Sequence, residues 1–335
     1  MSITEENWRE LETPQHTPGR SMRRIHAESA HDIHIAVTYP QRKRMLVLDT
    51  DDRAYERAAT AYGRLPRTQG LELAFTRLTR QHYELTITLT SDSLKNVFTP
   101  LVMDIAWAIS QATDDVGAVT TAINQFERWQ TLLKSLGEDG LGADARRGLY
   151  GELLVLKDYV IPELGPANGI LGWTGPLGTN QDFQLTDCAI EVKATTARAT
   201  SEITIANERQ LDRTGTADLV FGLVVLDERR GGLGTSLNAM VEGVRAALPG
   251  PPQAGLEGRL ARIGYFPQHT NNYDEPRYTL REIRFWSVHG DFPRIVESEF
   301  RPGVSTCSYR IQTAGLDAYA ITKDEVRKLI RGSHG

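Results

Sequence analysis

Three charged residues in one short stretch of the sequence have the types and spacing for metal-assisted hydrolysis. Asp182 begins one strand-like segment, and Glu191 and Lys193 stand two apart in the next. Because side chains alternate along a strand, Glu191 and Lys193 share one face. A hairpin that turns at residues 186–187 places Asp182 directly opposite Glu191, with Cβ atoms about 4.5–5.5 Å apart. We therefore expect two carboxylates and a lysine to converge on one spot.

This arrangement favours a metal site over an ordinary pair of strands. Like charges directly opposite each other destabilise a sheet, so a pair of carboxylates there indicates a divalent cation. Hard oxygen ligands suit Mg²⁺, and a lysine beside them can offset charge that develops on a phosphate. Together these groups could hydrolyse a phosphodiester. The alternative, with Glu191 and Lys193 on a solvated face and Asp182 in a loop, stays open.

Asp182 and the Glu-Val-Lys triplet that ends at Lys193 resemble the motif of the PD-(D/E)XK nuclease superfamily of restriction enzymes and repair nucleases. The residue before the aspartate is Gln181, where the motif's name has proline, a departure that many members share. The resemblance covers roughly residues 144–226. It implies an α/β (α+β) chain whose restriction-endonuclease-like core is a mixed β-sheet flanked by helices.

The resemblance also implies roles for particular residues. Glu152 is similar to the acidic residue on the helix before the sheet, although it could instead face water. Arg209 and Gln210 lie in the segment after the motif strands and could present polar groups to the substrate, or form a solvated helix face. The family's metal is Mg²⁺, for which Mn²⁺ can substitute. Its implied ligands are Asp182, Glu191 and the backbone carbonyl of Val192. Lys193 would orient the nucleophile.

The whole chain is similar to a bacterial family of PD-(D/E)XK proteins found beside methyltransferases and helicase-like ATPases in restriction or phage-defence islands. This wider resemblance implies a metal-dependent DNA endonuclease. DNA is the expected substrate, and helicase, ATPase and methyltransferase subunits are candidate partners. A homodimer is a further expectation. The alternative is a non-catalytic DNA-binding or scaffold subunit that retains the nuclease fold.

The amino-acid composition is typical of a globular protein and argues against several other classes of protein. The net charge of −5 argues against a protein that coats nucleic acid by charge alone. No apolar run approaches the roughly 20 residues that span a bilayer, and the acidic first residues do not form a secretory signal. Cys188 and Cys307 are too few for a disulfide framework or a cysteine-based zinc site. We therefore expect a cytoplasmic protein with no membrane partner.

The chain is predicted to contain a β-rich N-terminal module over residues 1–115, a connector over 116–143 and a nuclease-like domain with a C-terminal extension over 144–335. Residue patterns predict strands over 33–39, 44–48, 71–78, 83–90, 182–185, 189–194, 203–205, 217–226 and 278–288. They predict helices over 96–111, 116–134, 144–159, 206–211, 237–248 and 321–330. Glycine and proline indicate loops over 165–178 and 249–252.

Overall fold

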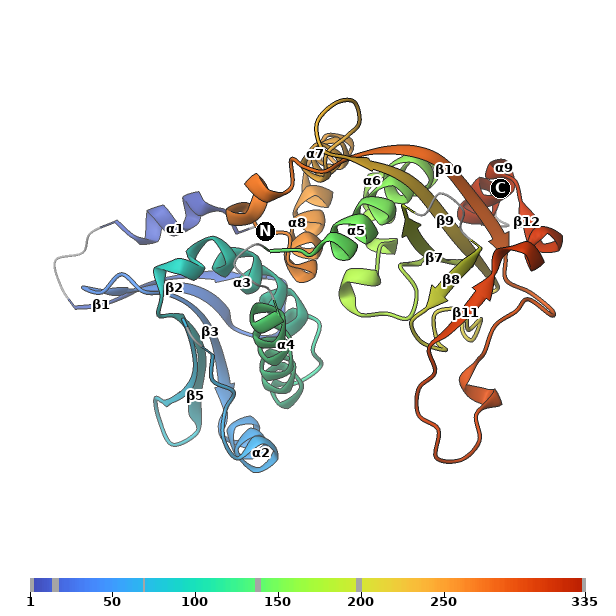
Figure 1. Cartoon of the computed structure of the whole chain (residues 1–335). Helices are drawn as coiled ribbons and strands as arrows, with labels where there is room; N and C mark the ends of the chain where they lie inside the picture. Colours follow the sequence, from blue (N-terminus) through green and yellow to red (C-terminus); the bar gives the residue numbers. More distant parts are fainter. Residues whose placement is uncertain (1–2, 14–17, 69, 136–139, 197–200, 333–335) are drawn as a thin grey trace. The chain divides into compact units, whose positions relative to one another are not determined.

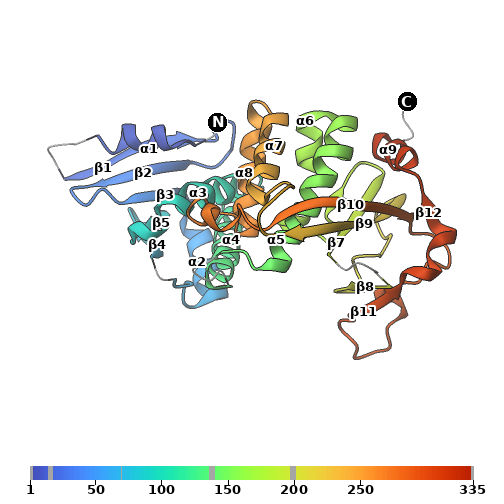
Figure 2. The ribbon, with the colours of Figure 1, turned by 45° about the horizontal axis from the view of Figure 1, so that its top comes forward.

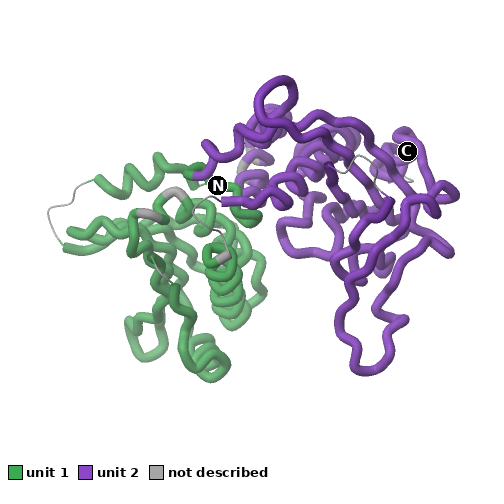
Figure 3. The backbone as a smooth tube through the Cα atoms, in the orientation of Figure 1, with its two compact units in different colours: residues 1–137, 261–268 green, residues 138–260, 269–335 purple. Residues whose placement is uncertain are grey.

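The computed structural model describes residues 3–13, 18–68, 70–135, 140–196 and 201–332. The chain forms two compact units (Figure 3). Unit 1 consists of residues 1–137 and 261–268, and unit 2 consists of residues 138–260 and 269–335. The residues predicted to do chemistry all lie in unit 2.

Unit 1 contains a five-stranded antiparallel sheet in the order β1-β2-β3-β5-β4 (Figure 1). Its strands are β1 (Gly19–Ile25), β2 (Ile33–Tyr39), β3 (Arg44–Asp51), β4 (Leu71–Arg77) and β5 (His82–Leu89). Its helices are α1 (Glu5–Leu11), α2 (Asp52–Tyr62), α3 (Lys95–Ser110) and α4 (Asp115–Ser135). The predicted strands over 33–39, 44–48, 71–78 and 83–90 are confirmed.

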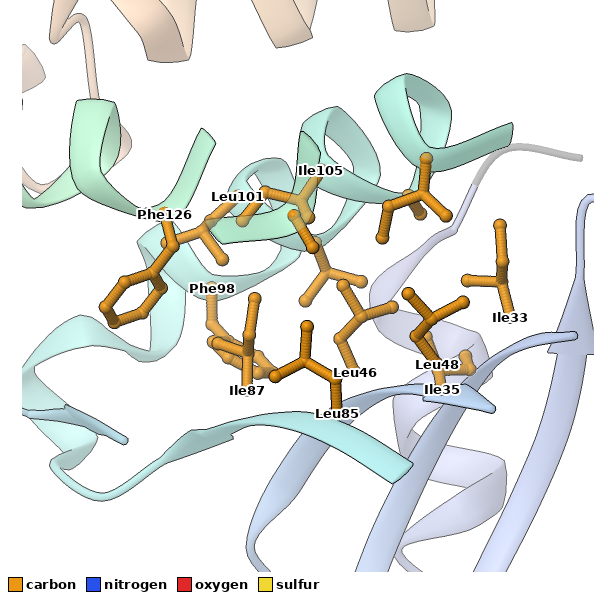
Figure 4. Close-up of a cluster of buried hydrophobic side chains, with 14 of the residues drawn as sticks. Ile33, Ile35, Leu46, Leu48, Leu85, Ile87, Phe98, Leu101, Ile105 and Phe126 are labelled. Carbon is orange, nitrogen blue, oxygen red and sulfur yellow. The ribbon is translucent and has the colours of Figure 1, made fainter. Parts of the chain in front are cut away.

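One face of this sheet packs against α3 and α4. Alternate residues of the strands, such as Ile35 and Leu85, are buried with Phe98 and Ile105 of α3 and Phe126 of α4 (Figure 4). Residues that point to the other face, such as Ala36 and Val47, are buried as well. The helix that the sequence assigns to a connector is α4, and it packs on α3 within unit 1.

The segment 261–268 completes the core of unit 1 although it is distant in sequence. Phe266 is buried and its ring stacks on that of Trp129, with centroids 6.2 Å apart. Arg262 forms an ion pair with Asp104, and both side chains are largely buried. Trp129 donates its indole N–H to the same carboxylate, at 2.9 Å. Unit 1 is therefore built from two separate stretches of the chain.

Unit 2 contains a mixed sheet in the order β12-β10-β9-β7-β6 and a two-stranded ribbon, β11-β8. Figure 2 shows β10, β9 and β7 side by side. The strands are β6 (Phe183–Gln184), β7 (Cys188–Thr195), β8 (Glu202–Ile205), β9 (Asp218–Arg229), β10 (Arg277–Ser287), β11 (Tyr309–Gln312) and β12 (Ala320–Ile321). Strands β7 and β9 are parallel, and the other pairings are antiparallel.

The helices of unit 2 are α5 (Ala143–Val155), the π-helical turn η2 (Leu156–Val160), α6 (Ile161–Gly172), α7 (Leu237–Ala247) and α9 (Lys323–Arg331). Two of these helices, α5 and α6, precede the first strand of its sheet, and α7 and α9 follow later strands. Helix α8 (Pro251–Ile263) leads back to unit 1. The described parts of both units also contain short 3-10 helices. These are η1 (Asp92–Leu94), η3 (Gly175–Leu177), η4 (Pro267–Asn272), η5 (Glu297–Glu299), η6 (Thr313–Gly315) and η7 (Asp317–Tyr319).

The central strand β9 is buried on both faces, as its continuous apolar sequence predicts. Phe221 and Leu223 lie on one face in a cluster with Ile205 of β8 and Ile311 of β11. Helix α5 covers the opposite face of the sheet. The sheet is thus a middle layer, and its strand β9 is covered on both faces.

Three predictions in unit 2 about where helices end and loops begin are wrong. The helix expected to end before Pro162 continues through η2 into α6, because proline is tolerated in the first turn of a helical segment. The loop predicted over 165–178 is helical as far as Gly172, with a kink at Gly165 (φ 75°). The linker predicted over 249–252 is shorter than expected, because α8 already starts at Pro251, again with prolines in its first turn.

Gly151 controls how closely α5 approaches β7. A Cβ atom added at Gly151 would lie 2.8 Å from the Cβ of Ala194. We expect Gly151→Ala to push the helix from the strand and destabilise the protein by about 1–3 kcal/mol, measured by chemical denaturation. The control is Gly148→Ala on the same helix, where an added Cβ meets nothing within 4 Å. It should be neutral or stabilising by up to about 1 kcal/mol. Equal effects of both substitutions would contradict this packing argument.

Candidate active site

The β6–β7 hairpin has the register that the sequence predicts. Phe183 pairs with Ile190 and Gln184 with Ala189. At the turn, the N–H of Leu185 donates to the carbonyl oxygen of Cys188, at 2.8 Å. The same register, continued outward, sets Asp182 opposite Glu191. The two acids therefore lie near each other at one end of the hairpin, where the charge of Asp182 raises the pKa of Glu191.

Asp182 is fixed from several directions. Its carboxylate accepts the backbone N–H of Val192, at 2.7 Å. Its carbonyl oxygen accepts the N–H groups of Thr174, at 2.9 Å, and of Gly175, at 2.8 Å. A Cβ at Gly175 would lie 3.0 Å from a carboxylate oxygen of Asp182, so glycine permits this close approach. The aspartate is therefore held against the backbone of β7.

Glu191 is a buried acid with one oxygen that lacks a partner. Its side chain is 1% exposed. The Lys193 ammonium donates to Oε1 of Glu191, at 2.6 Å, and to Oε1 of Gln210, at 3.1 Å. Within the described residues, Oε2 of Glu191 has no hydrogen-bond partner. A buried carboxylate oxygen in this condition is costly unless a proton or a cation binds it.

Glu152 joins the same cluster from α5. Its carboxylate accepts the indole N–H of Trp173, at 2.8 Å, and Trp173 itself is fully buried. Burial raises the pKa of Glu152 well above its ordinary value, and the charge of Asp182 raises it further. Glu191 also raises this pKa, and Lys193 lowers it. All four predicted catalytic residues therefore interact electrostatically in one place.

The pKa values of the other two acids are also raised above their ordinary values. Burial raises the pKa of Asp182 to about 6, although the Val192 N–H and Lys193 lower it. Burial raises the pKa of Glu191 to about 8, and the nearby Asp182 carboxylate contributes to this shift. Clusters of acids with raised pKa values are typical of functional sites.

The structure separates the two residues expected to contact substrate. Gln210 reaches the site through its contact with Lys193. The Arg209 side chain is 52% exposed and pairs with Glu208, at 3.6 Å, and with Glu297, at 3.2 Å. The predicted helix over 206–211 is wrong, because these residues form turns. Arg209 therefore points to a different set of partners from those of Gln210.

Two residues near the site carry no signal in the sequence. Trp173 binds Glu152 from a position 21 residues away. In the sequence Gln181 is only a departure from the motif, yet its buried side chain contacts the turn that bears Gln210. Both contacts depend on the fold rather than on local spacing.

The donor set fits an oxygen-preferring cation with one backbone ligand. Within the described parts of the chain, no three His, Cys, Asp or Glu side chains are grouped so that they alone could hold a metal ion. Asp182 and Glu191 would need a further ligand, and the carbonyl of Val192 is the one that the motif implies. The unpartnered Oε2 of Glu191 is the observation that favours this fit.

The mixed sheet, the hairpin with its acids and lysine, and the preceding helix with Glu152 together define a PD-(D/E)XK fold. A family model described as "Putative PD-(D/E)XK family member, (DUF4420)" matches residues 4–314, and the chain belongs to this family. The match confirms the predicted superfamily and the α/β fold class. No curated protein and no solved structure matches the chain. No helix among the described residues has both the length and the apolar character needed to cross a membrane.

Proposed function

We propose that this protein is a metal-dependent DNA endonuclease of a bacterial restriction or phage-defence system. One observation carries the proposal: Asp182, Glu191 and Lys193 meet at one end of a hairpin, with a buried oxygen of Glu191 left unpartnered. An acid–acid–lysine set of this kind matches the requirements of phosphodiester hydrolysis. Membership of a PD-(D/E)XK family supports the same class of reaction.

Each residue has a separate role in the proposed reaction. Asp182, Glu191 and the carbonyl of Val192 would hold Mg²⁺, or Mn²⁺ in its place. When bound, the metal supplies Lewis acidity and lowers the pKa of a bound water. Lys193 can only donate hydrogen bonds, so it would orient the attacking water and stabilise charge on the phosphate oxygens. Glu152 would assist from α5, directly or through a water molecule.

The proposed biological setting follows from the resemblance to proteins of defence islands. DNA is the proposed substrate, and helicase, ATPase and methyltransferase subunits are the proposed partners. The proposed location is the cytoplasm. A homodimer is part of the proposal because two sites, one per subunit, can cut both strands of a duplex.

A cleavage assay across several substrates tests the proposal. Double-stranded, single-stranded and modified DNA, with RNA as a comparison, are incubated with Mg²⁺, Mn²⁺ or a chelator. We expect cleavage of DNA that requires a metal. Failure to cut any DNA in the presence of either metal would reject the proposal.

Calorimetric titration with Mg²⁺ examines the metal site separately. Asp182→Asn should abolish binding because it removes a charged ligand. Asp317→Asn, which changes an exposed acid of unit 2, is the control and should bind normally. Absence of Mg²⁺ binding by the unmodified protein, together with no cleavage, would favour a non-catalytic subunit that retains the fold.

A further inference from the structure

The position of Lys193 depends on a turn formed by residues 206–212. In this turn, Oε1 of Gln210 accepts the backbone N–H of Ala206, at 2.9 Å. The same oxygen accepts the ammonium of Lys193, at 3.1 Å. A displacement of the turn would therefore withdraw one of the two acceptors that hold the lysine.

Gln181 connects this turn to the start of the hairpin through hydrogen bonds. Its side-chain amide donates to the carbonyl oxygen of Arg209, at 2.9 Å, and to that of Asp212, at 3.2 Å. Its own Oε1 accepts a hydrogen bond from Gln184, at 3.2 Å. The residue is 6% exposed. The side-chain amide group of Gln181 has two N–H donors, and both are directed to carbonyl oxygens of the turn.

The turn has a second attachment on its other side. Arg294 donates to the carbonyl oxygen of Leu211, at 3.0 Å. The buried carboxylate of Glu208 accepts the backbone N–H of Cys307, at 3.0 Å. These contacts tie the turn to the segment between β10 and β11, but neither ties it to the hairpin. Gln181 supplies that connection.

We propose that Gln181 is a positioning residue, which holds the 206–212 turn so that Gln210 meets Lys193. Its consequence for catalysis rests on the proposed nuclease function. A proline at this position, as the superfamily motif is named, would have no side-chain donor for the two carbonyl groups. In this chain Gln181, which precedes Asp182, thus supports Lys193 of β7 through the 206–212 turn.

Hydrogen exchange tests the attachment without requiring activity. Gln181→Met keeps the length of the side chain but removes its donors. We expect the amide of Ala206 to exchange at least about tenfold faster in this variant, because the turn opens more often. Gln181→Glu, which keeps size and polarity but cannot donate when ionised, should behave similarly and replaces the first variant if that one fails to fold.

The control for this experiment is Thr216→Val. Thr216 also donates to backbone carbonyl groups, those of Asp187, at 3.3 Å, and Asp218, at 2.8 Å, but it lies outside the turn. This variant should leave exchange at Ala206 unchanged. Exchange at the rate of the unmodified protein in a folded Gln181 variant would overturn the proposal.

Kinetics then test the link to Lys193. Gln181→Met should lower kcat about tenfold with KM within about twofold, as loss of alignment at the reacting groups predicts. In a Gln210→Leu background it should have almost no added effect, because both changes act through the same contact. Additive effects would overturn the proposed route. If the unmodified protein cuts nothing, exchange alone decides the role of Gln181 in holding the turn, and the nuclease function is what fails.

Discussion

Lys193→Ala is expected to slow metal-dependent DNA cleavage by at least about 100-fold, because it removes a positioned cation from the developing charge. The Lys193 ammonium contacts Glu191 and Gln210 and lies at the end of the hairpin that we propose binds a phosphate. Glu191→Ala should abolish cleavage as well, since it removes a proposed metal ligand. Single-turnover cleavage rates at saturating Mg²⁺ measure both effects.

The control for these variants is Lys323→Ala, which removes an exposed lysine at the start of α9. It should cleave at the normal rate. Circular dichroism and melting temperature should show that all three proteins are folded. Undiminished cleavage by both site variants would reject the assignment of Lys193 and Glu191.

Glu191→Gln is expected to stabilise the metal-free protein at pH 8 while abolishing cleavage. In the folded protein the pKa of Glu191 is about 8, against an ordinary 4.5, so the folded state binds more protons than the unfolded state across this range. The free energy of unfolding therefore falls as pH rises from about 4.5 to 8. Glutamine does not titrate, and removing this effect should be worth on the order of 2 kcal/mol at pH 8.

Chemical denaturation in the presence of a chelator, at pH 5 and at pH 8, measures this difference. The unmodified protein should lose stability between the two values, and Glu191→Gln should lose less, since only its Asp182 and Glu152 still titrate in the site. Asp317→Asn, at an exposed acid, should follow the unmodified protein. Mg²⁺ should restore stability to the unmodified protein at pH 8 and much less to the glutamine variant, because a neutral amide is a weaker ligand than the proposed carboxylate. Identical pH dependence in all three proteins would contradict the buried-acid argument.

The sequence predicts the hairpin well because its pattern is local. Side chains alternate with a period of two, so the turn at residues 186–187 determines which residues of the two strands face each other. This was enough to bring Asp182 to Glu191 and to put Lys193 on the same face. The continuous apolar run of β9 likewise indicates a strand buried on both sides.

The turn that bears Gln210 was mistaken for a helix for a physical reason. Asn207 accepts the N–H of Arg209 with its own side chain, at 3.0 Å, which favours a turn over helical hydrogen bonds. Helical propensity alone does not account for the competition between this side-chain hydrogen bond and the backbone hydrogen bonds of a helix. The partner of Gln181 in that turn lies 28 residues away, so only the folded chain reveals it.

Strand β1 was missed because it lacks the expected apolar alternation. It carries three arginines, and acids from other segments neutralise them. Arg20 pairs with Glu84, and Arg23 pairs with Glu10. Pairings of this kind cannot be recognised before the strands are placed.

The return of the chain to unit 1 at residues 261–268 means that this unit cannot be isolated by cutting after residue 137. A fragment that ends there would retain Asp104 and Trp129 but lack the arginine and the aromatic ring that cover them. During synthesis, the N-terminal unit can reach its native packing only after most of the nuclease-like unit has left the ribosome. The two units are therefore expected to mature together rather than one after the other.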